Sequence, residues 1–189
     1  MKPLRQGDID SLCGLYAIIN AIRTCSTYAA APSLSQARQL FGELIKHHEA
    51  TFPTFARVGM DVEQVEAALK FALKFCFEKY GLHISYRYVE FTGLKAMQAA
   101  LEKHLDDQGR HAAIVAADAH STVVTEVMGK LWRLCDSYRY EHLYCIGEQQ
   151  RIQRCSGLLR ARPELHTFLL KYDKGPKYGI GPKNRAEKI

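Results

Sequence analysis

The sequence contains no long hydrophobic run and none of the cysteine spacings that are typical of zinc sites. No stretch of 18 or more consecutive apolar residues occurs, so no transmembrane helix is expected. The N-terminus has no apolar segment followed by a cleavage site, so no secretory signal is expected either. No two cysteines are spaced as C-x-x-C, and no histidine lies three to five residues from another. The sequence therefore predicts neither a structural metal nor a cofactor.

Most of the net positive charge belongs to the C-terminal end. The chain of 189 residues has a net charge of +6, but residues 171–189 alone hold six basic and two acidic residues. Residues 1–170 keep 20 basic against 18 acidic residues. A nucleic-acid-binding domain should carry a basic face interleaved with aromatic side chains, and no such pattern is present. No nucleic-acid partner is expected.

The size and the cysteine count favour one domain in a reducing compartment. A chain of this length is large enough to bury a core without disulfide bonds, so its six cysteines are expected to be free thiols. We predict a single catalytic domain over 1–172 and a basic, flexible tail over 173–189. The expected location is cytoplasmic, with delivery by a specialised secretion system as the alternative.

Helical patterns come first along the chain and strand patterns follow. Helices are expected from a cap at Asp10 or Ser11, from the capping boxes at Ser33 and Asp61, and over 94–105, whereas 52–59 reads as a loop. Strands are expected at 83–91, 112–117, 121–127, 131–135 and 165–172, and 138–157 has no clear pattern. This order predicts an α+β fold in which an N-terminal helical part packs on a C-terminal antiparallel sheet.

Cys13 is the strongest candidate for chemistry. It lies in the first turn of a predicted helix, where unpaired N–H groups and the helix dipole favour the thiolate, which is the nucleophilic form. The following Gly14 is expected to leave the approach to the sulfur open. A buried structural cysteine is the alternative. Gln6 can fold back beside the sulfur, and with the Cys13 N–H it would supply two donors to an oxyanion.

His120 and Asp136 are the candidate base and its partner. We expect a hairpin whose turn is Met128–Lys130, because a three-residue turn places both side chains on one face of the sheet. A two-residue turn would place them on opposite faces. Asp118, two residues before His120, is the rival acid. His104 and Cys135 are more simply explained by packing, and His47 and His48 by an exposed helix end, where cations suit the helix dipole.

The ordered set Gln6, Cys13-Gly14, His120 and Asp136 resembles the papain-like cysteine peptidase superfamily. The nearest branch is the bacterial double-glycine (bacteriocin-leader-processing) peptidases and their stand-alone relatives. The resemblance covers about residues 1–140 and implies that glutamine lines the oxyanion hole, cysteine is the nucleophile, histidine the base and aspartate its orienting acid. Leu12 and Ser121 depart from the pattern of the leader-processing enzymes, so their substrate does not carry over.

The expected function is therefore a cysteine-dependent peptidase or amidohydrolase that acts on a peptide or protein. A deamidase, transglutaminase or acyltransferase with the same residues is the first alternative, because all of these need the same nucleophile, base and oxyanion donors. A binding module without catalytic activity is the second.

Overall fold

The computed structural model describes residues 3–5, 11–27, 31–91, 93–106, 110–117, 120–137, 141–146, 151–154, 157–160 and 165–173. Five helices lie in these ranges: α1 (Cys13–Cys25), α2 (Leu34–His47), α3 (Phe52–Val58), α4 (Val62–Tyr80) and α5 (Leu94–His104). The strands are β1 (Ile84–Phe91), β2 (His111–Ala117), β3 (His120–Met128), β4 (Leu131–Leu134), β5 (His142–Ile146), β6 (Arg151–Arg154), β7 (Gly157–Arg160) and β8 (Leu165–Tyr172).

All eight described strands form one antiparallel sheet. Their order is β1-β8-β2-β3-β4-β5-β6-β7, so the last of the described strands is inserted between β1 and β2. From β2 to β7 the strands follow one another as a meander of neighbouring antiparallel pairs. The predicted α+β class with an antiparallel sheet is confirmed. Strands β5 and β6 and the first residue of β7 lie within 138–157, where no clear pattern was expected.

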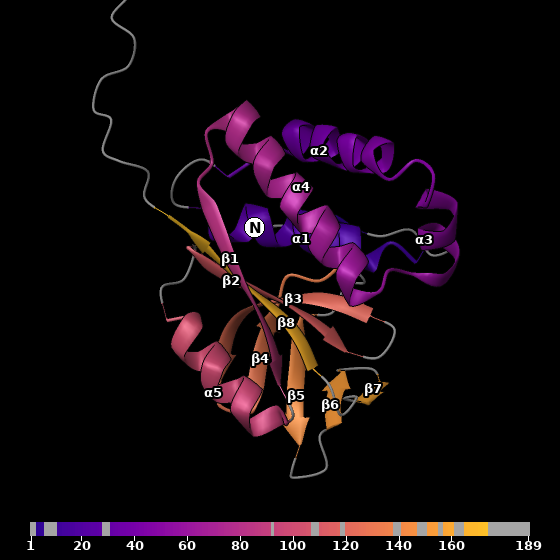
Figure 1. Cartoon of the computed structure of the whole chain (residues 1–189). Helices are drawn as coiled ribbons and strands as arrows, with labels where there is room; N and C mark the ends of the chain where they lie inside the picture. Colours follow the sequence, from indigo (N-terminus) through magenta and orange to yellow (C-terminus); the bar gives the residue numbers. More distant parts are fainter. Residues whose placement is uncertain are drawn as a thin grey trace, which may run out of the picture.

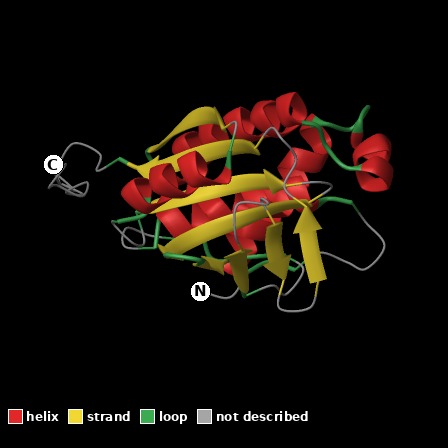
Figure 2. Ribbon diagram, turned by 90° about the horizontal axis from the view of Figure 1, so that it is seen from below, coloured by secondary structure: helices red, strands yellow, loops and turns green. Residues whose placement is uncertain are grey.

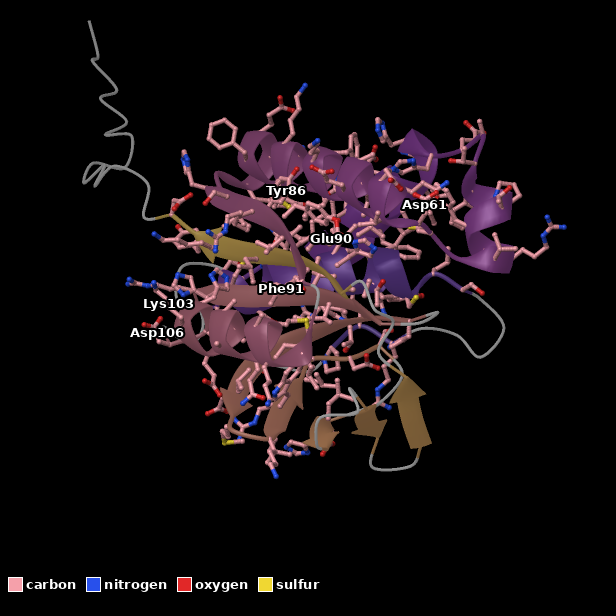
Figure 3. All side chains as sticks on the ribbon, turned by 60° about the horizontal axis from the view of Figure 1, so that its bottom comes forward. Asp61, Tyr86, Glu90, Phe91, Lys103 and Asp106 are labelled. Carbon is pink, nitrogen blue, oxygen red and sulfur yellow. The ribbon has the colours of Figure 1, made fainter. Side chains whose placement is uncertain are left out.

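Helices cover both faces of this sheet. In Figure 1, α1 to α4 lie on one side of the strands and α5 lies on the other, and Figure 2 shows the strands as one curved layer between helices. Figure 3 labels Asp61 just before α4 and Lys103 near the end of α5, two helices that pack on opposite faces. We call these faces the α1 face and the α5 face.

Alternation along the strands builds a separate core on each face. On β2, Ala112 and Ile114 pack among the helices of the α1 face, whereas Ala113 and Val115 pack with α5. Because side chains alternate along a strand, an apolar run such as this one can serve two cores at once. Helix α1 lies innermost, with ten of its thirteen residues buried. The core therefore fixes α1 firmly against β2 and β3.

The two predicted capping boxes are confirmed. The Ser33 and Asp61 side chains each accept a hydrogen bond from the backbone N–H three residues on. In turn, the side-chain oxygens of Gln36 and Gln64 accept hydrogen bonds from the backbone N–H groups of Ser33 and Asp61. Each box satisfies two N–H groups that the first helical turn leaves unpaired.

Two expectations about the N-terminal half are wrong. Helix α1 begins at Cys13 after Leu12, with no side-chain cap, because Ser11 is bonded elsewhere. The stretch expected to be a loop contains α3, with Pro53 in its first turn, where a missing N–H costs nothing. Burial of Phe55 explains this short helix, because its ring is 1% exposed.

The hairpin between β3 and β4 differs from the predicted one. Met128 pairs with Leu131, so the turn has two residues rather than three. A β-bulge at Thr125 then inserts one extra residue, and Val124 pairs with Leu134. This is the pairing that a three-residue turn would have produced. The predicted turn was wrong, but the bulge restores the register near His120.

No described helix is both long enough and apolar enough to span a membrane. The division into a domain over 1–172 and a tail over 173–189 stays a prediction, and residues 174–189 lie outside the described ranges.

Candidate active site

The beginning of α1 meets the beginning of β3 at the sulfur of Cys13. The backbone N–H of Ser121 donates a hydrogen bond to Cys13 Sγ at 3.4 Å, across 108 residues of sequence. Cys13 is the first residue of α1, and its side chain is buried, with the residue 8% exposed. The sulfur therefore lies where the first-turn N–H groups of a helix and a strand N–H converge, a place that stabilises negative charge.

The segment that enters α1 is held by the end of α3. The Ser11 backbone N–H donates to Ala56 O at 3.0 Å, and its hydroxyl donates to Arg57 O at 3.4 Å. The carbonyls at the C-terminus of a helix have no partner within the helix, so they are free to accept these bonds. Ser11 thus anchors the chain two residues before Cys13 instead of capping α1.

Gly14 packs against the start of α4. A Cβ at this position would lie 3.1 Å from Val65 Cγ2 and 3.3 Å from Met60 Sδ. That Gly14 leaves the approach to the sulfur open stays a prediction. Glycine allows α1 and α4 to approach closely, and this packing fixes the turn that carries Cys13.

His120 and Asp136 are hydrogen-bonded to each other. His120 Nε2 lies 2.7 Å from Asp136 Oδ2, and the two side chains are 10% and 0% exposed. A fully buried carboxylate this close to an imidazole favours the tautomer with the proton on Nε2. The other ring nitrogen, Nδ1, is then left for a second partner, and hydrogen bonding between His120 and Cys13 affects the ionisation of both groups.

The pKa values of Cys13 and His120 shift in opposite directions. Burial disfavours the thiolate, but hydrogen bonding to His120, its charge, and the N–H groups of Ser121 and Gly14 outweigh this effect and lower the pKa of Cys13. Burial also disfavours the imidazolium, but hydrogen bonds to Asp136 and Cys13 and their charges raise the pKa of His120 to about 9. Both shifts favour a thiolate–imidazolium pair.

The other cysteines with described side chains have raised pKa values. Burial raises the pKa of Cys25 and raises that of Cys76 to about 12. Burial likewise raises the pKa of Cys135, which packs in the core of the α1 face as its alternation predicts. Among the four described cysteines, Cys13 alone has a lowered pKa.

The structure brings together three of the four predicted site residues. Cys13, His120 and Asp136 meet at the start of α1 and the start of β3, whereas Gln6 lies outside the described residues, as does the rival acid Asp118. His104 lies elsewhere, with Nε2 at 2.9 Å from Leu170 O near the other end of β2 and β8.

Two contributions to the site were missed by the sequence analysis. The N–H of Ser121 has no sequence signal, because every residue except proline carries one. The bonds from Ser11 to α3 were also missed, since α3 itself was read as a loop. A helix-compatible Pro at the second position of 52–58 was the available signal.

No model of a protein family matches the chain, and no curated protein matches it closely enough to serve as a relative. Among the described residues, no three His, Cys, Asp or Glu side chains are arranged to hold a metal ion.

Proposed function

We propose that the protein is a cysteine-dependent hydrolase that acts on an amide bond of a peptide or protein. One observation carries the proposal: Cys13 Sγ accepts the Ser121 N–H and interacts with His120, which is itself bonded to the buried Asp136. Thiol acyl transfer requires a nucleophile that contacts a base, and a base that is held in turn by an acid. The resemblance to papain-like cysteine peptidases agrees with this reading.

The reaction follows from the charges of the pair. The Cys13 thiolate attacks the substrate carbonyl carbon, and the carbonyl electrons move to oxygen. His120 in its imidazolium form gives its proton to the leaving amine as the carbon–nitrogen bond breaks, which leaves a thioester on Cys13. Neutral His120 then takes a proton from water, the hydroxide attacks the thioester, and the acid product leaves as the thiolate and imidazolium re-form.

Two donors are assigned to the oxyanion. The first is the backbone N–H of Cys13, which belongs to the uncapped first turn of α1. The second is the Gln6 side chain, assigned from the sequence and the resemblance. A preorganised donor of this kind is typically worth about 2.7–4 kcal/mol in the transition state. Asp136 holds the imidazole and stabilises its charge, and no metal or cofactor takes part in the scheme.

Labelling with a thiol-directed peptide electrophile, followed by mass spectrometry, tests the nucleophile. The label is expected on Cys13 and should be lost in Cys13→Ser, whereas Cys25→Ser, at a cysteine of raised pKa, is the matched control and should label as the wild type does. A label on another cysteine would contradict the proposal.

A substrate screen tests the reaction. Peptide cleavage is expected from the wild type and not from Cys13→Ala. Release of ammonia without cleavage would point to a deamidase or transglutaminase with the same residues. A Cys13 that remains unreactive toward every electrophile would leave a binding module as the better reading.

A further inference from the structure

One buried hydroxyl beside the site has no hydrogen-bond partner. Thr122 is 3% exposed, and its Oγ1 is completely buried without a partner among the described residues. An unsatisfied buried polar group of this kind destabilises the folded state, and valine would fill the same volume without that cost. Packing alone therefore does not explain a threonine at this position.

Its strand neighbours on one side are apolar. Thr122 shares a face with Val124, two residues on, and is paired on β2 with Val115. Both of these valines belong to the core of the α5 face. The hydroxyl is thus the polar exception in a row of β-branched apolar side chains.

On its other side Thr122 neighbours the segment that leads from β4 to Asp136. Val124 pairs with Leu134, and the next N–H along, that of Cys135, donates to Val123 O at 2.9 Å. β4 ends at Leu134, and extending its register by two residues puts position 136 opposite Thr122. Side chains of opposite residues on one face have Cβ atoms about 4.5–5.5 Å apart. Asp136 Oδ2 accepts from His120, and a carboxylate offers about four acceptor positions in all.

We infer that Thr122 is a positioning residue, whose hydroxyl turns about χ1 to donate to the Asp136 carboxylate and keep it aligned on Nε2 of His120. This inference rests on the proposed function, because it assigns Thr122 to the Cys13–His120 pair. A second donor is most valuable when the imidazolium has formed, since the carboxylate then has to stay in place to stabilise it. Asp136 and Cys13 are the charged groups that act on His120.

The test uses the rate at which iodoacetamide alkylates Cys13 as a function of pH, which needs no substrate. In Thr122→Val the imidazolium is held less well, so the midpoint of the profile should move to higher pH. Alkylation at pH 6 should become about three- to tenfold slower, the range expected when one hydrogen bond to a charged group is lost and its effect is passed on through His120. Thr122→Ser keeps the hydroxyl and should restore the wild-type profile.

Stability separates positioning from a structural role. Thr122→Val keeps the volume and loses one hydrogen bond to a carboxylate that His120 still satisfies, so its melting temperature should fall by no more than a few degrees, while its alkylation slows. In the Asp136→Asn background, Thr122→Val should cause no further shift, because the group it acts on is gone. Should Thr122→Val fail to fold, Thr122→Ala provides the same loss of the hydroxyl.

The outcomes distinguish the two proposals. A wild-type Cys13 that alkylates with the pH profile of an ordinary thiol contradicts the proposed function itself. If the wild type alkylates with a lowered midpoint and Thr122→Val has the same midpoint, the role of Thr122 alone is overturned. The same holds if Thr122→Val still shifts the midpoint in the Asp136→Asn background.

Discussion

The opposite pKa shifts of Cys13 and His120 predict an unusual pH dependence of stability. The pKa of His120 is raised to about 9 in the folded protein, so its contribution is fully present below about pH 6.5 and is lost as pH rises through 9. The pKa of Cys13 is lowered, so its contribution is present above about pH 8.5 and is lost as pH falls through the folded value. Between these limits the two slopes oppose each other, because the folded protein favours a proton on His120 and disfavours one on Cys13.

Replacing Cys13 by serine should remove the contribution that opposes the slope of His120. Asp136 still supports the imidazolium in this variant, so the free energy of unfolding should fall as pH rises from 6.5 to 8.5. A shift from about 6.5 to about 9 corresponds to at most about 3 kcal/mol. Because Cys13 itself contributes to that shift, a fall of about 1–2 kcal/mol relative to the wild type is expected.

Urea unfolding at pH 6.5, 7.5 and 8.5 measures this difference. Subtracting the wild type from Cys13→Ser removes the contributions of all other titrating groups, and Cys13→Ser/Asp136→Asn serves as the control in which the slope should largely vanish. A difference between Cys13→Ser and the wild type that stays constant over this range would refute the ion pair, since it would mean that a neutral thiol faces a neutral imidazole.

Three further changes test the site. Asp136→Asn should lower kcat by about two to four orders of magnitude in a peptide-cleavage assay, because the amide no longer stabilises the imidazolium. Asp118→Asn should lower kcat less. The reverse order would identify Asp118 as the acid that orients His120. Gly14→Ala should lower activity, because its Cβ would lie 3.1 Å from Val65 Cγ2. The control Gly42→Ala, whose Cβ would have nothing within 4 Å, should raise the free energy of unfolding by about 1 kcal/mol in urea titrations. Full activity in Gly14→Ala would show that this glycine does not position Cys13. Treatment with EDTA should leave activity unchanged, and a loss reversed by added zinc would count against a metal-free mechanism.

Much of the fold could be predicted from local signals. The capping boxes at Ser33 and Asp61 and the left-handed Gly81, with φ of 66°, mark helix ends because each satisfies backbone groups within a few residues. The alternating and apolar runs of β1 to β4 and β8 were likewise visible. These features depend on neighbours in sequence, which a single chain displays directly.

The site was less predictable, because its geometry depends on contacts between distant segments. The pairing of β3 with β4 was inferred from a three-residue turn, but the molecule combines a two-residue turn with a bulge at Thr125. The Thr125 hydroxyl donates to Arg133 O at 3.3 Å, a hydrogen bond between the two strands that the sequence pattern does not predict. The helix α3 was missed for the same reason, because burial of Phe55 against distant residues decides it.

The position of β8 has a consequence for how the polypeptide reaches this state. Since the latest strand of the described chain fills the space between β1 and β2, both of those strands have an open edge until β8 arrives. Open strand edges readily pair with other chains. The pairing of β8 with β1 and β2 joins segments that are distant in sequence, and such pairing slows folding. A fragment that stops before Leu165 should therefore aggregate rather than fold.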